Sequence, residues 1–319
     1  MAVNLKGRSL LTLKHYSKSE ILFLIDLADR VKAQRHAGEV HQRFRGKTIA
    51  LLFEKLSTRT RCAFETAFGE EGGYPVFLSS NDIHLGVKET VEDTARVLGR
   101  MFDAIEFRGF AQEMVDALAT YSGVPVYNGL TDLYHPTQVL ADLQTLREAT
   151  GGLAGKSITY VGDGRNNVAR SLMIACAKVG THFSVAAPES LQPDRDTVLE
   201  AKNYAEESGA EIIVAADPAE VLPKSDAVYT DVWVSMGEEE KSAERIALLT
   251  PYRVTADLMK QTGKPSTVFL HCLPAVRGNE VTSEVMDGPQ SRIWDQAENR
   301  KHTIKAVMLA TMLAPSELG

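Results

Sequence analysis

The sequence predicts an α/β protein of two domains, each a parallel sheet flanked by helices. Short apolar runs alternate with longer segments in which apolar residues recur at helical spacing, and this alternation is typical of a βα series. The chain has 319 residues, about twice the length of a common domain. Gly151, Gly152 and Gly155 lie between two such series. These glycines predict the boundary between the domains.

The first series begins with an amphipathic helix at residues 19–35, where apolar residues share one helical face. The predicted strands that follow are residues 48–53, 75–78, 104–107 and 124–127, and the predicted helices are residues 58–71, 91–101, 112–121 and 137–149. A polar loop at residues 79–86 follows the second strand. We assign residues 1–150 to the first domain.

The second series starts after the glycines. Its predicted strands are residues 157–161, 182–186, 211–214, 227–230 and 267–270, and its clearest helices are residues 168–179 and 194–208. A last helix is expected at residues 297–313, from the spacing of Ile304, Val307 and Met308. We assign residues 151–296 to the second domain and join the C-terminal segment, residues 297–319, to the first.

Composition excludes several classes of protein. The sequence is 44% hydrophobic and 24% charged, as in ordinary soluble globular proteins. A net charge of −7 without a basic run argues against a nucleic-acid surface. No apolar run approaches the ~20 residues that cross a membrane, and the N-terminus lacks the apolar core of a signal peptide. Three cysteines without a CxxC pair suit a reducing compartment, so we expect a cytoplasmic enzyme.

Five adjacent residues combine three hydroxyls with two guanidiniums: Ser57, Thr58, Arg59, Thr60 and Arg61. They lie between a predicted strand and a predicted helix, with Ser57 as the helix N-cap. A helix N-terminus offers unpaired N–H groups and partial positive charge, which together with hydroxyls and guanidiniums suit a phosphate. The segment lacks the Gly-Lys-Ser/Thr of a Walker A loop. The alternative is an ordinary capped helix with solvated arginines.

Other segments with polar, ionisable or glycine residues follow other predicted strands. In the first domain they are Arg108, Gly109, His135, Pro136, Thr137 and Gln138, and in the second they are Asn167, Asp231, Ser235, Met236, Gly237, His271, Cys272 and Leu273. Ligands of open parallel sheets bind beyond the carboxyl ends of the strands, so we expect the active site in the cleft between the domains. Each residue also has an alternative: a surface arginine, a capping histidine or asparagine, a capped loop, or a buried thiol.

We predict no cofactor and no metal. Gly162 and Gly164 begin a dinucleotide-binding fingerprint, but Asn167 stands at the third glycine position, and no acidic residue ends the next strand. The histidines lack the spacing of metal ligands, and the cysteines form no pair. His271 alternates to the face of its strand opposite Cys272, so it is a poor base for that thiol.

The motifs and their order resemble the aspartate/ornithine carbamoyltransferase family. The motifs shared with the whole family are Ser57-Thr58-Arg59-Thr60-Arg61 and His135-Pro136-Thr137-Gln138. Those similar to the ornithine branch are Ser235-Met236-Gly237 and His271-Cys272-Leu273-Pro274. Arg108-Gly109 and Asp231 also match the resemblance in sequence and order. The resemblance covers essentially the whole chain, including the segment from Asp295 to Arg300.

The resemblance implies transfer of a carbamoyl group from carbamoyl phosphate to the δ-amino group of L-ornithine, giving citrulline and phosphate in arginine metabolism. It implies that carbamoyl phosphate is held by Ser57, Thr58, Arg59, Thr60, Arg108, His135, Gln138, Cys272, Leu273 and Arg300. It implies that ornithine is held by Asn167, Asp231, Ser235 and Met236. A homotrimer or a multiple of it is also implied, with the loop at residues 79–86 reaching a neighbouring subunit and His84 at a position where some members have a ligand-binding glutamine.

The chemistry agrees with these residues. Arg108, His135 and Thr58 are suitable donors to the oxyanion that forms on the carbonyl, and the arginines stabilise the leaving phosphate. Asp231 and Cys272 are candidates to position the amine and accept its proton. The alternatives are a carbamoyltransferase for putrescine or aspartate, and a non-catalytic subunit that only binds carbamoyl phosphate. The direction of the reaction in the cell stays open.

Overall fold

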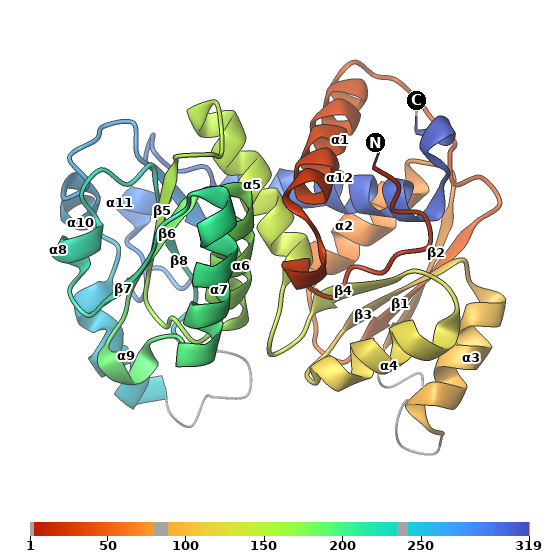
Figure 1. The fold of residues 1–319 in the computed structure, drawn as a ribbon, viewed down its shortest axis with the longest axis horizontal. Helices are drawn as coiled ribbons and strands as arrows, with labels where there is room; N and C mark the ends of the chain where they lie inside the picture. Colours follow the sequence, from red (N-terminus) through yellow and green to blue (C-terminus); the bar gives the residue numbers. More distant parts are fainter. Residues whose placement is uncertain (1–2, 80–88, 235–241, 319) are drawn as a thin grey trace. The chain divides into compact units, whose positions relative to one another are not determined.

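The computed structural model describes residues 3–79, 89–234 and 242–318, which form two compact units (Figure 1). Unit 1 consists of Met1–Ala141 and Glu298–Gly319, and unit 2 of Asp142–Ala297. The units divide inside helix α5 (Pro136–Thr150), not at the glycines that follow it. Helix α12 (Ile293–Met312) likewise contributes residues to both units.

Unit 1 contains a four-stranded parallel sheet in the order β2-β1-β3-β4. Its strands are β1 (Thr48–Phe53), β2 (Tyr74–Ser79), β3 (Ala104–Arg108) and β4 (Val126–Leu130), and its helices are α1 (Lys18–His36), α2 (Thr58–Gly69), α3 (Val91–Met101) and α4 (Gln112–Ser122), with the start of α5 and most of α12. β1 reads as a continuous apolar run because helices cover both faces of the sheet.

The two faces of this sheet carry different side chains. Leu52 and Phe107 belong to the apolar cluster formed with α3 and α4. Because successive side chains of a strand alternate, Arg108 projects to the opposite face, on which Figure 1 shows α1, α2 and α12. On that face the hydroxyl groups of Tyr127 and of Thr311 in α12 form a hydrogen bond of 2.7 Å. The polar side chains of β3 therefore lie on the face of the sheet that carries α2 and α12.

Unit 2 contains a five-stranded parallel sheet in the order β7-β6-β5-β8-β9. Its strands are β5 (Ser157–Val161), β6 (His182–Ala186), β7 (Ile212–Ala215), β8 (Ala227–Thr230) and β9 (Val268–His271), and its helices are α6 (Asn167–Val179), α7 (Arg195–Ser208), α8 (Pro218–Val221), α9 (Ser242–Leu249), α10 (Ala256–Lys260) and α11 (Ser283–Met286). The two parallel sheets flanked by helices confirm the predicted fold class.

The order of strands reverses once in each sheet. In unit 1 the reversal lies between β1 and β3, and in unit 2 between β5 and β8. The crevice beyond such a switch point is where open parallel sheets bind ligands. Ser57 follows β1, Arg108 ends β3, and Asp231 follows β8 directly. Both sheets therefore present candidate site residues at the place that their topology favours.

Most predicted elements are confirmed to within a few residues. β4 begins two residues later than predicted and extends to Leu130, with a shift in its pairing to β3 between Phe107 and Arg108. The short helices α8, α10 and α11 are too brief to give a periodic signal. No helix within the described ranges is both long enough and apolar enough to cross a membrane. The predicted loop at residues 79–86 lies outside the described residues, except for Ser79 at the end of β2.

Candidate active site

The start of α2 has the predicted cap. The backbone N–H of Thr60 donates to Ser57 Oγ at 3.2 Å, and Ser57 itself has an extended conformation. This cap confirms the strand-to-helix junction predicted from the sequence. Thr58 is exposed, Arg59 is half-buried and Thr60 is fully buried, so the segment presents both accessible and buried donors at one helix N-terminus.

Two buried guanidiniums meet at Thr60. Arg300 Nη2 donates to Thr60 Oγ1 at 2.7 Å, and Arg108 Nη1 approaches the same oxygen at 3.4 Å. Arg300 is 2% exposed and Arg108 is 7% exposed. These arginines come from α12 and β3, so unit 1 brings together three segments that are far apart in the sequence. Buried cations held this close together, with one shared hydroxyl between them, have the chemistry that suits an anion.

His135 lies beside this group at the start of α5. Burial is the main cause that holds its pKa well below the usual range, and the charges of Arg300, Arg108 and Arg59 lower it further. His135 is therefore neutral at physiological pH and carries one ring N–H. The N–H of Gln138, one turn along α5, donates to the carbonyl oxygen of His135 at 3.1 Å. A neutral imidazole can donate to a carbonyl oxygen without adding charge.

Arg61 is directed elsewhere. Its Nε donates to Glu65 Oε1 at 2.9 Å, and its guanidinium lies 3.7 Å from the centre of the Phe77 ring. The sequence could not separate Arg61 from Arg59, because both lie in one short motif. The rotation of α2 separates them: two positions along a helix turn the side chain through roughly 200°.

Glu106 is the main residue that the sequence analysis missed. It is fully buried on β3, two residues before Arg108 on the same face, and its carboxyl oxygens have no hydrogen-bond partner among the described residues. Burial raises its pKa well above the usual range, against the opposing effects of Arg108 and Arg300. A charged residue inside an otherwise apolar strand was the available signal.

Two glycines give these side chains room. A Cβ at Gly129 would lie 1.9 Å from Glu106 Oε1, and a Cβ at Gly109 would lie 2.2 Å from Glu54 Oε2. Gly109 is not among the glycines with positive φ, so glycine is needed there for the close approach of Glu54 and of the buried Phe107 ring.

Unit 2 brings Asp231 and Cys272 together. Cys272 Sγ donates to Asp231 Oδ1 at 3.0 Å. Burial raises the pKa of Asp231, while His271 and the Cys272 hydrogen bond oppose the rise. A carboxylate with a raised pKa next to a half-buried thiol can hold an ammonium group and accept a proton from it.

His271 has its own partners. Its Nδ1 accepts from the N–H of Leu273 at 2.9 Å, so its proton is on Nε2, which lies 3.3 Å from Glu280 Oε1. Both ring nitrogens of His271 therefore have partners other than Cys272. A ligand atom of each of Asp231, His271 and Cys272 nevertheless lies within 4.8 Å of the others. Strand alternation would have separated His271 from Cys272, but β9 ends at His271 and the chain turns at Leu273, which has a φ of 59°.

The start of α6 differs from the expectation. Asn166, not Asn167, is the N-cap, and its Oδ1 accepts from the N–H of Ala169 at 2.7 Å. Asn166 Nδ2 also lies 3.4 Å from Asp231 Oδ2. The capping alternative for Asn167 is therefore wrong, because Asn167 is the first residue of α6 itself. The predicted residues Ser235, Met236 and His84 lie outside the described residues.

Known protein families match both halves of the chain. Residues 8–148 match the family model "Aspartate/ornithine carbamoyltransferase, carbamoyl-P binding domain", and residues 154–311 match "Aspartate/ornithine carbamoyltransferase, Asp/Orn binding domain". The chain belongs to the aspartate/ornithine carbamoyltransferase family. The group of buried guanidiniums around Thr60 falls in the range of the carbamoyl-phosphate domain model, except for Arg300, and the Asp231–Cys272 pair falls in the range of the Asp/Orn domain model.

Individual carbamoyltransferases are similar over nearly the full length. An ornithine carbamoyltransferase of Caldanaerobacter subterraneus is 65% identical over 313 residues, which cover 98% of this chain and 100% of that protein. A catabolic ornithine carbamoyltransferase of Bacillus licheniformis is 54% identical over 327 aligned positions, covering 97% of this chain and 98% of that protein. The solved ornithine carbamoyltransferase of Pyrococcus furiosus has a TM-score of 0.95 at 46% identity and covers 98% of this chain and 99% of that one.

Proposed function

We propose that this protein is an ornithine carbamoyltransferase, which transfers the carbamoyl group of carbamoyl phosphate to the δ-amino group of L-ornithine and releases L-citrulline and phosphate. The observation that carries the proposal is the group of buried guanidiniums around Thr60 and neutral His135. It occurs in a chain that matches ornithine carbamoyltransferases from end to end. We assign carbamoyl phosphate to unit 1 and ornithine to unit 2.

In this proposal, Arg59, Arg108 and Arg300 bind the phosphate together with the N-terminus of α2. Phosphate is the leaving group, and these cations stabilise the charge that it gains as the C–O bond breaks. His135 donates a hydrogen bond to the carbonyl oxygen, which becomes an oxyanion in the tetrahedral intermediate. Its neutral state matters, because a protonated imidazole among three guanidiniums would cost free energy before the substrate arrives.

The amine of ornithine arrives as an ammonium with a reference pKa of about 10.4. Asp231 binds this ammonium, and Asp231 and Cys272 together accept the proton that must leave before attack. The amine nitrogen then forms a bond to the carbonyl carbon. The departing phosphate can accept the second proton. No covalent intermediate with the enzyme is needed. Ser235 and Met236 remain candidates to bind the α-amino acid end of ornithine.

The test is an assay of product formation with ornithine, putrescine and aspartate offered in parallel. We expect citrulline from ornithine and at least a hundredfold lower rates with the other two amines, since hydrogen-bonding groups built for one substrate reject analogues that leave them unpaired. Equal rates with putrescine would contradict the choice of acceptor. Binding of carbamoyl phosphate without any transfer would contradict catalysis and favour a regulatory subunit.

We further propose a cytoplasmic homotrimer or a multiple of it. The support is the family resemblance of the segment at residues 79–86, which in the family reaches a neighbouring active site. Sedimentation equilibrium should yield three times the chain mass of 34.9 kDa, or a multiple of that value. Similarity to a catabolic relative makes the direction in the cell a separate question. Growth of a strain that lacks the gene would decide it. A requirement for added citrulline would indicate the synthetic direction, and poor growth on arginine as the nitrogen source would indicate the catabolic direction.

A further inference from the structure

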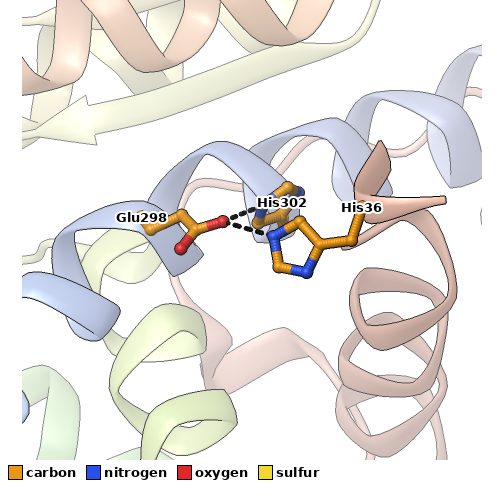
Figure 2. Close-up of side chains that lie close together, drawn as sticks. All are labelled: His36, Glu298 and His302. Carbon is orange, nitrogen blue, oxygen red and sulfur yellow. Dashed lines mark hydrogen bonds and ion pairs between the residues drawn. The ribbon is translucent and has the colours of Figure 1, made fainter. Parts of the chain in front are cut away.

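A group of possible metal ligands lies in unit 1, and none of its members is assigned to the reaction. Figure 2 shows His36 at the end of α1 facing Glu298 and His302, which are one turn apart on α12. His36 Nε2 lies 3.0 Å from Glu298 Oε1, and His302 Nε2 lies 3.1 Å from the same oxygen. We propose that His36, Glu298 and His302 form a binding site for a divalent transition-metal ion such as Zn²⁺.

The geometry suits one ion. Zinc binds histidine nitrogen and carboxylate oxygen at about 2.0–2.2 Å, so tetrahedral ligand atoms lie roughly 3.3–3.6 Å apart. All three ligand atoms lie within 4.8 Å of one another. The ring centres of the two histidines are 6.1 Å apart, and the ring planes are inclined at 84°. The two imidazoles therefore approach a common point from different directions, and only small side-chain movements are needed.

The donor set also suits the metal. Two imidazoles and one carboxylate are a common set for zinc, and they leave a fourth position for water or another ligand. They favour zinc, cobalt or nickel over magnesium or calcium, which prefer oxygen ligands. The set carries one negative charge, so it neutralises half the charge of a divalent ion.

The hydrogen bonds in the group place a proton on Nε2 of each histidine, since a carboxylate oxygen only accepts. Nε2 must give up this proton before it can bind a metal ion. His302 Nδ1 has no hydrogen-bond partner among the described residues, so the proton can move to that nitrogen. A change of tautomer in place is therefore enough to free His302 Nε2 for an ion.

Two lysines near the site oppose a cation. Lys32 and Lys301 both act to lower the pKa of His302. Each has an anionic or polar partner: Lys32 Nζ donates to Asn299 Oδ1 at 2.7 Å, and Lys301 Nζ donates to Glu70 Oε1 at 3.0 Å. These contacts reduce the repulsion. We expect an affinity in the micromolar range, below that of structural sites with cysteine ligands.

The position of the site indicates what the ion would do. It joins the last turn of α1 to α12, the helix that carries Arg300 between Glu298 and His302. Arg300 points instead to Thr60, about 200° around α12 from Glu298. An ion here would stabilise the packing of α1 on α12 without touching the substrate. Its main effect would be on the stability of unit 1.

The experiment must separate this site from Asp231, His271 and Cys272, which are also close enough to bind a metal. All measurements are therefore made on the full chain with Cys272→Ala, after treatment with a chelator. Zn²⁺ is titrated by calorimetry, and Tm is followed with and without a hundredfold excess over Kd. We expect about one Zn²⁺ per chain and a rise in Tm of about 5–10 °C.

His36→Gln removes an exposed ligand at a helix end, and Glu298→Gln keeps an oxygen acceptor while removing the charge. In the same background, each should weaken Zn²⁺ binding at least tenfold and, at the same Zn²⁺ concentration, reduce the rise in Tm by about half or more. His41→Gln is the matched control, since His41 is paired with Glu39 outside the group, and it should bind as the parent does. A parent that binds no Zn²⁺ at 1 mM (about a thousandfold above the expected Kd), or a His36→Gln variant that binds as tightly as the parent, would overturn the proposal.

Discussion

Replacing Thr60 with valine, a side chain of nearly the same shape and size, should clearly weaken the binding of carbamoyl phosphate. Valine keeps the shape of the side chain but removes Oγ1, the oxygen that accepts from Arg300 Nη2 at 2.7 Å and lies 3.4 Å from Arg108 Nη1. A hydrogen bond to a charged partner contributes about 1.5–3 kcal/mol, and the longer contact contributes less. We therefore assign a loss of about 2 kcal/mol to Thr60→Val.

This loss has two measurable consequences. If Arg300 is no longer held in place, the KM for carbamoyl phosphate should rise by about 30-fold, since 1.4 kcal/mol corresponds to a factor of ten. The same loss should lower the Tm of unit 1 by about 4–8 °C, since 1 kcal/mol shifts Tm by about 2–4 °C at roughly 150–250 residues. The assay is the initial rate of citrulline formation at saturating ornithine, with carbamoyl phosphate varied. Thr60→Ser retains the hydroxyl and should recover most of the affinity.

Two results would refute the reasoning. A KM for Thr60→Val within twofold of the wild type would show that the hydroxyl does not position the guanidiniums. Equal losses in Thr60→Ser, which keeps the hydroxyl, and in Thr60→Val, which removes it, would also show that the hydroxyl is not what holds the guanidiniums. The fall in Tm alone does not test this role of the hydroxyl, so the comparison of the two variants decides.

Three further predictions concern the other residues of the site. Because the pKa of Glu106 is raised in the folded state, its contribution to stability is complete below the ordinary value of 4.5 and is lost as pH rises through the folded-state value. Glu106→Gln should therefore reduce the decline in the free energy of unfolding above pH 4.5. Urea titrations in which the wild type and the variant lose stability in parallel as pH rises would contradict this. Asp231→Asn should lower kcat/KM for ornithine by about 10²-fold and remove the acidic limb of the pH profile of kcat/KM. Cys272→Ala should lower kcat and change the kinetics of ornithine more than those of carbamoyl phosphate. Ornithine kinetics that are unchanged across pH in the alanine variant would remove the thiol from the mechanism. Arg61→Ala should leave the KM for carbamoyl phosphate unchanged while Arg59→Gly raises it severely, because the Arg61 guanidinium is bound to Glu65; similar effects of both changes would contradict the assignment.

Local rules were sufficient for the start of α2. A buried strand, a hydroxyl at the cap and an apolar helical face are signals within about twenty residues, and the Ser57 cap follows from them. The same rules were insufficient at α6, where Asn166 and Asn167 have equal capping propensity. The cap there is the residue whose side chain reaches the N–H of Ala169. That choice depends on where the apolar face of α6 packs, which lies outside the motif.

The sequence alone therefore determined the alternation of strands and helices, the family, and the set of side chains that can bind an anion and an amine. These properties depend on residue type, local spacing and order. Tertiary structure decided which members of the set meet. It brings Arg300 to Thr60 across 240 positions of the chain, turns Arg61 away, and places the buried carboxyl of Glu106 within the electrostatic reach of Arg108 and Arg300. The physical reason is that packing of helices against both faces of a sheet selects the long-range contacts, and no local pattern of residues encodes the distance between two segments that are far apart in the chain.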